Sequence, residues 1–125
     1  MTMHDESNRP APLDTAPLEE LRAFSEDDGP DLLSELIDIF LDDTPPRLDA
    51  LLECVKGGDP VGTRENAHAL KSSCAQLGAL HLSEMCKQLE SMGREEQLDG
   101  ALPLAEEALF EFGFVKEALL KEKRA

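Results

Sequence analysis

Four long segments with apolar residues three or four positions apart constrain the fold of this chain more than any other feature of its sequence. This spacing places the apolar side chains on one face of an α-helix, which must then pack against other helices. The segments run over about residues 31–56, 60–77, 80–92 and 101–121, and glycine or proline separates them. Because the connections are short, we expect an all-α fold, an antiparallel up-and-down four-helix bundle.

A short extra helix is expected before the bundle, over about residues 16–25, with Asp14 or Thr15 as its N-cap. Its apolar face consists of Leu18, Leu21 and Phe24. The preceding segment is polar, contains two prolines and lacks periodicity, which is typical of a disordered tail. We therefore divide the chain into a tail of residues 1–14 and a helical bundle domain of residues 15–125.

Prolines and glycines predict how the helices begin and end. Pro45 and Pro46 interrupt the second helix, but the apolar phase continues across them, so one kinked helix is expected from Asp31 to Lys56. Gly93 is expected to end the fourth helix. The apolar face expected for the last helix consists of Leu102, Ala105, Leu109, Phe112, Val115 and Leu119.

The formal net charge of −15 argues against nucleic acid and membrane surfaces as partners, since both are bound through clustered lysine and arginine. The charge is unevenly distributed. Residues 1–60 contain sixteen acids and four bases, whereas residues 60–83 contain two bases and one acid. An anionic group would therefore meet the least repulsion along the third helix.

No apolar run approaches the ~20 residues that cross a bilayer, and the N-terminus lacks the apolar core of a signal peptide. We therefore expect a cytoplasmic protein. Three cysteines without a Cys-x-x-Cys pair fit a reducing compartment. They are Cys54, Cys74 and Cys86. Small buried apolar residues are the simpler interpretation, because a zinc site would need them to converge with His68 or His81.

One face of the third helix is unusual. It lies one position round from the apolar stripe and holds an imidazole, an ammonium one turn later and otherwise small residues. These residues are His68, Lys71, Ser72 and Ala75. An exposed helix face normally carries bulky charged side chains. Here the small neighbours leave the histidine uncovered, so it is accessible to another macromolecule.

Residues 67–79 read Ala-His-Ala-Leu-Lys-Ser-Ser-Cys-Ala-Gln-Leu-Gly-Ala, and this stretch resembles the signature of histidine-containing phosphotransfer (HPt) domains. The helix pattern over residues 15–120 also fits the antiparallel bundle of that family. The resemblance implies that His68 accepts and donates a phosphoryl group. Ser72 stands where many members have glycine, and its small hydroxyl side chain is compatible with that role.

The resemblance further implies a mechanism and partners. His68 Nε2 would attack the aspartyl phosphate of a receiver domain and later pass the phosphoryl group to another receiver aspartate. The expected partners are receiver domains of a hybrid histidine kinase and a response regulator. The receiver would supply Mg²⁺, and this chain would bind no cofactor or metal. Lys71 would neutralise phosphoryl charge, Gln76 or Ser72 would orient the ring or the phosphoryl group, and Arg64 would add a second positive contact.

The chain is expected to be a phosphocarrier rather than an enzyme, since it has no glycine-rich phosphate loop for ATP. An apolar docking surface is expected beside His68, although each of its residues could belong to the core instead. The candidates are Leu36, Ile37, Phe40, Leu41 and Ala75. The alternative function is a phosphorylation-independent helical adaptor of the same fold. A free-standing shuttle and a part of a larger hybrid kinase both remain open.

Overall fold

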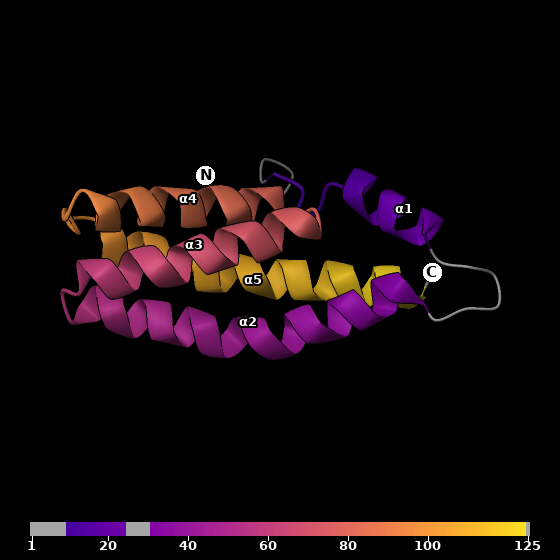
Figure 1. Cartoon of the computed structure of the whole chain (residues 1–125), viewed down its shortest axis with the longest axis horizontal. Helices are drawn as coiled ribbons and strands as arrows, with labels where there is room; N and C mark the ends of the chain where they lie inside the picture. Colours follow the sequence, from indigo (N-terminus) through magenta and orange to yellow (C-terminus); the bar gives the residue numbers. More distant parts are fainter. Residues whose placement is uncertain (1–9, 25–30, 125) are drawn as a thin grey trace, which may run out of the picture.

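The computed structural model describes residues 10–24 and 31–124, which form helices and no strand (Figure 1). Predictions for residues 1–9 and 25–30, including most of the tail and the end of the first helix, fall outside this part of the chain. The helices are α1 (Ala16–Ala23), α2 (Leu32–Lys56), α3 (Pro60–Gln76), α4 (Leu80–Arg94) and α5 (Ala101–Arg124).

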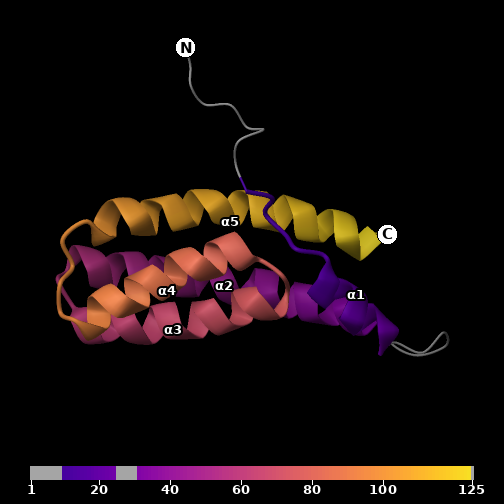
Figure 2. The ribbon, with the colours of Figure 1, turned by 90° about the horizontal axis from the view of Figure 1, so that it is seen from above.

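Helices α2 to α5 form an antiparallel bundle, and the predicted four-helix bundle with a short N-terminal helix is confirmed. Helix α3 packs against α2 and α4, and α5 packs against the same two helices. Figures 1 and 2 accordingly place α3 and α5 at opposite corners of the bundle. Leucine and alanine side chains make up most of the core. None of the described helices combines the length and apolarity needed to cross a membrane.

Aspartate side chains cap two of the helices. Asp31 accepts a hydrogen bond from the backbone N–H of Ser34 at 3.2 Å, and Asp59 accepts one from Gly62 at 3.0 Å. Each bond satisfies an N–H group that the first helical turn leaves without a partner. The caps set the start of α2 and of α3, the helix that carries His68.

Helix α2 passes through Pro45 and Pro46 without a break, which confirms the prediction of a single helix. Figure 1 shows it curving along its length, as expected of a helix in which two prolines remove backbone donors and crowd the preceding turn. Thr44 and Leu48 on either side of the prolines are buried. Packing against the bundle therefore maintains the helix where the local sequence disfavours it.

The prediction that Gly93 ends α4 is wrong. The helix continues to Arg94, and Gly93 is buried within it. A Cβ atom on Gly93 would lie 2.7 Å from the carbonyl oxygen of Pro60 and 2.8 Å from the backbone nitrogen of Arg64. The missing side chain thus allows α3 and α4 to approach closely, beside the residues that surround His68.

Two residues assigned to apolar faces are on the surface. Phe24, after the last residue of α1, is 74 % exposed, and Leu102 in α5 is 36 % exposed. Helix α1 packs on the core through Leu18 and Leu21, and the first turn of α5 buries Ala101 instead of its larger neighbour. Periodicity identifies a stripe, but the packing partner decides how far along the helix the stripe is covered.

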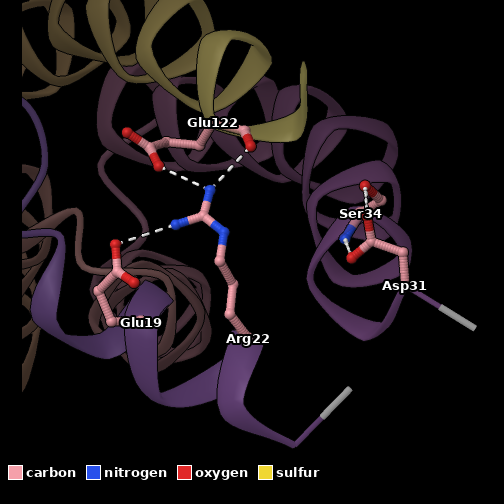
Figure 3. A network of polar contacts seen from close by, with 5 residues as sticks. All are labelled: Glu19, Arg22, Asp31, Ser34 and Glu122. Carbon is pink, nitrogen blue, oxygen red and sulfur yellow. Dashed lines mark hydrogen bonds and ion pairs between the residues drawn. The ribbon is translucent and has the colours of Figure 1, made fainter. Parts of the chain in front are cut away.

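The N-terminal segment and α1 are tied to the bundle at two places. The backbone N–H of Asp14 donates to the carbonyl oxygen of Gly78 at 2.7 Å, and Leu13 packs against the core. Arg22 of α1 donates to the backbone carbonyl (2.9 Å) and the carboxylate (2.8 Å) of Glu122 in α5, as Figure 3 shows. The end of the segment that we assigned to the tail therefore contacts the folded domain.

Candidate functional site

His68 lies in the middle of α3, next to the buried stripe of that helix. The stripe consists of Ala67, Leu70 and Cys74. By contrast, 62 % of the His68 side chain is exposed. Ser72 and Ala75, on the same face toward the C-terminus of α3, are small exposed residues. The His68 ring is therefore exposed among small neighbours, as the sequence predicts.

A carboxylate from α4 holds this exposed ring. His68 Nδ1 lies 2.8 Å from Oε2 of Glu90, whose side chain is only 6 % exposed. Lys71 Nζ contacts the other oxygen, Oε1, at 2.6 Å, and Arg94 contacts Oε2 at 3.1 Å. Glu90 thus joins three basic side chains from α3 and α4 into one cluster.

The sequence reasoning missed Glu90 and Arg94. One signal for Glu90 was present, because it follows the buried Cys86 by four residues and so lies on the core-facing side of α4. A charged side chain at such a position needs a partner. We assigned the orientation of the ring to Ser72 or Gln76, but in the structure the contact to the ring belongs to Glu90.

The Glu90 carboxyl is held in its ionised form. The hydrogen bond from Lys71 lowers its pKa, and the contact with His68 lowers it further, whereas desolvation acts in the opposite direction. An ionised carboxylate can only accept hydrogen bonds, so a neutral His68 ring carries its proton on Nδ1. The lone pair of the neutral ring is then on Nε2, across the ring from Glu90.

A hollow of about 360 Å³ opens beside His68 between α3 and α4. It is lined by Arg64, Glu65, His68, Glu90 and Arg94. Arg64, the expected second positive contact, therefore does lie near the ring, and Arg94 adds a guanidinium from the neighbouring helix. This arrangement can accommodate an anionic group attached to the imidazole.

The predicted docking residues divide into core and surface. Ile37 is fully buried and Phe40 is 5 % exposed, so the prediction that these two form a docking surface is wrong. Their side chains point into the bundle because they follow the same stripe as the other core residues of α2. Leu36 and Leu41 are partly buried, and Ala75 is exposed.

Gln76 lies away from the His68 cluster. It lines a small hollow between α2 and α3, together with Leu36 and Ile39. Ile39 is 56 % exposed, and the sequence reasoning did not select it. Apolar surface is therefore present on the α2 side of α3, two helical turns beyond His68.

No group of three or more histidine, cysteine or acidic side chains within residues 10–24 and 31–124 is arranged to hold a metal ion. Cys74 and Cys86 are buried, Cys54 is partly buried, and all three are free thiols. A hydrogen bond with the neighbouring Cys86 and burial both raise the pKa of the Cys74 thiol. The cysteines thus have the environment of apolar core residues.

Comparison with known proteins agrees with this geometry. The model of the Hpt domain family matches residues 35–122. The crystal structure of histidine-containing phosphotransfer protein B (HptB) from Pseudomonas aeruginosa PAO1 is similar, with a TM-score of 0.81 and 31 % sequence identity. The match covers 90 % of this chain and 95 % of that chain. No curated protein sequence matches the chain at a significant level.

Proposed function

Since this chain belongs to the Hpt domain family, we propose that His68 accepts a phosphoryl group from the aspartyl phosphate of a receiver domain and passes it to the aspartate of another receiver. The chain is thus a histidine phosphotransfer protein of a two-component phosphorelay. The observation that carries the proposal is an imidazole that is exposed to a partner yet held in one orientation by a buried carboxylate.

Glu90 prepares the ring for attack on phosphorus. With the proton held on Nδ1, the lone pair of Nε2 forms the new N–P bond, and the P–O bond to the aspartyl carboxylate breaks with its electron pair. The ring becomes positively charged, and the Glu90 carboxylate beside Nδ1 compensates that charge. The proton stays on Nδ1 throughout, so the reverse transfer to a second receiver uses the same arrangement.

The basic residues of the cluster stabilise the phosphoryl group. Lys71 and Arg94 already lie against Glu90, and Arg64 shares the hollow beside the ring. Cations placed around a transferring phosphoryl group stabilise the charge on its oxygens. Ser72 offers a hydroxyl one turn beyond His68 on the same face. The Mg²⁺ that completes the reaction would come from the receiver.

The experiment that tests the proposal is incubation with a receiver domain phosphorylated by radiolabelled acetyl phosphate. The label should move to this chain, be lost in acid, survive in base and disappear in His68→Gln. His81→Gln, which changes a histidine at the start of α4, is the matched control and should be labelled like the wild type. Lack of label with every receiver of the organism would favour a phosphorylation-independent adaptor instead.

A further inference from the structure

Helix α5 carries a pair of aromatic rings in its middle. Phe110 is 62 % exposed, and its ring contacts the partly exposed ring of Phe114 edge to face, with centroids 5.2 Å apart. Gly113 lies beside them, and a Cβ atom on it would meet no atom within 4 Å. A single exposed apolar residue is ordinary, but two adjacent rings beside bare helix backbone form a larger apolar surface.

The aromatic pair belongs to an exposed stripe that runs along α5. The residues of the stripe follow one another at steps of three or four positions, so they share one face of the helix. They are Pro103, Glu106, Phe110, Gly113, Glu117 and Lys121, and all are exposed. We call them the outer stripe. Since α5 packs on α2 and α4 with its other face, the outer stripe points away from the bundle.

The outer stripe and His68 belong to different sides of the molecule. Figure 2 shows α5 along one edge of the bundle and α3, the helix of His68, along the opposite edge. A partner seated on the outer stripe therefore leaves the His68 ring exposed.

Charge is distributed unequally along α5. Residues 101–112 carry three acids and no base, whereas residues 113–124 carry two acids and four bases. With five acids and four bases the helix is nearly neutral, in a chain of net charge −15. On the outer stripe, Glu106 lies in the acidic half and Lys121 in the basic half. Such a helix is complementary to a copy of itself that runs in the opposite direction.

The two charges of the stripe are available for a contact with another molecule. Lys123 of the same helix is already engaged, because it pairs with Asp38 of α2. Within residues 10–24 and 31–124, Glu106 and Lys121 form no ion pair. Both side chains are exposed.

We propose that the outer stripe binds the outer stripe of a second copy of this chain, with the two α5 helices antiparallel about a two-fold axis at Gly113 and Phe114. Glu106 of one copy then lies opposite Lys121 of the other, because the two residues are equally far from the axis along the helix. Two-fold symmetry repeats this pair at the other end of the contact. Gly113 lets the helices approach closely, since it has no side chain, and the Phe114 ring of the other copy covers it. The dimer does not depend on the proposed function.

The dimer should be weak, because one helix face on each copy is a small interface. The net charge of −15 opposes association, but at about 0.15 M salt charges more than ~8 Å apart are largely screened. We expect a dissociation constant on the order of 10–100 µM at this salt concentration. Sedimentation equilibrium over about 5 µM to 1 mM protein measures it.

The test is a charge reversal and its rescue. Lys121→Glu places two acids opposite each other at both ends of the contact and should raise the dissociation constant about tenfold or more. The double variant Glu106→Lys with Lys121→Glu has the wild-type net charge and should restore the wild-type value. Lys116→Glu is the matched control, because Lys116 is exposed on α5 but lies off the outer stripe. Phe110→Ser should weaken the dimer by removing an aromatic ring from the contact.

Three results would overturn the dimer. They are a wild-type chain that stays monomeric up to about 1 mM, equal weakening by Lys121→Glu and Lys116→Glu, and a double variant that associates no better than Lys121→Glu. The substituted residues are exposed, so the circular dichroism spectra of all variants should match that of the wild type. A change in association can then be assigned to the contact between copies rather than to unfolding.

Discussion

His68 and Glu90 stand twenty-two residues apart in the chain, and their Nδ1 and Oε2 atoms are 2.8 Å apart. The contact joins an imidazole that is 62 % exposed to a carboxylate that is 6 % exposed. Because the carboxylate is shielded from water, it attracts the ring more strongly than a surface acid would. The His68 ring is thereby held in one orientation while it stays exposed to solvent.

Replacement of Glu90 tests this relationship. In Glu90→Gln the charge beside Nδ1 is lost, and in Glu90→Ala the hydrogen bond is lost as well. Phosphotransfer to His68 should slow by about tenfold or more, with alanine the more severe, because the orienting partner of a functional imidazole has effects of this order. Nitrogen-15 NMR should show that the Nδ1–H tautomer is less populated. Glu84→Gln, an exposed acid on α4, is the control.

Lys71→Ala should separate phosphate chemistry from folding. The side chain is partly exposed and off the core stripe, so the helical circular dichroism spectrum should not change. Transfer should slow, or the phosphohistidine should hydrolyse sooner, because a cation near the phosphoryl oxygens is lost. Unchanged transfer kinetics and an unchanged phosphohistidine lifetime would show that the ammonium group serves only the ion pair with Glu90.

The lowered pKa of Glu90 makes stability depend on pH. Lys71 and His68 favour the charged carboxylate in the folded state, so its pKa lies below the ordinary value of 4.5. This contribution is present above about that pH and is lost as the pH falls through the lowered folded-state pKa. Urea unfolding at pH 7 to 3 should show the wild type losing its advantage over Glu90→Gln below about pH 4.5. A difference independent of pH would contradict the ion pair.

Two glycine substitutions should have opposite effects on stability. Gly93→Ala places a Cβ 2.7 Å from the Pro60 carbonyl oxygen, so α3 and α4 must move apart, at a cost of about 1–3 kcal/mol. Gly113→Ala, in α5, meets no atom within 4 Å and should stabilise the fold by about 0.5–1 kcal/mol. Thermal unfolding measures both. Stabilisation by Gly93→Ala would contradict the close approach of the helices.

Leu70→Ala tests the orientation of α3. The side chain is 1 % exposed, so its truncation should leave a cavity and lower the free energy of unfolding by about 2–5 kcal/mol. Leu102→Ala, at 36 % exposure, should cost about 1 kcal/mol or less. Equal effects would mean that α3 is rotated and that His68 does not face outward.

Much of the fold follows from local rules, and the sequence therefore predicted it. Apolar spacing identified α2 to α5, and the predicted starts near Asp31 and residue 60 agree with the capped starts of α2 and α3, because a cap depends only on the residues beside it. His68 and Lys71 share one turn of one helix, so the sequence also placed them together, and the resemblance to the HPt signature singled them out. Their roles in phosphotransfer stay predictions until they are measured.

The remainder depends on which helices pack together. Along α4, Glu90 looks like one more charged residue of an amphipathic helix, and only the approach of α3 brings it to His68. In a sequence, a glycine such as Gly93 can indicate either a helix end or a close contact between helices. The structure shows the close contact, because the backbone of Arg64 lies against Gly93. The sequence by itself thus determined the helices and the candidate histidine, because helical spacing and the motif around His68 both lie within one segment of the chain. Only the tertiary structure decided what holds the His68 ring, because its contact with Glu90 crosses from α3 to α4.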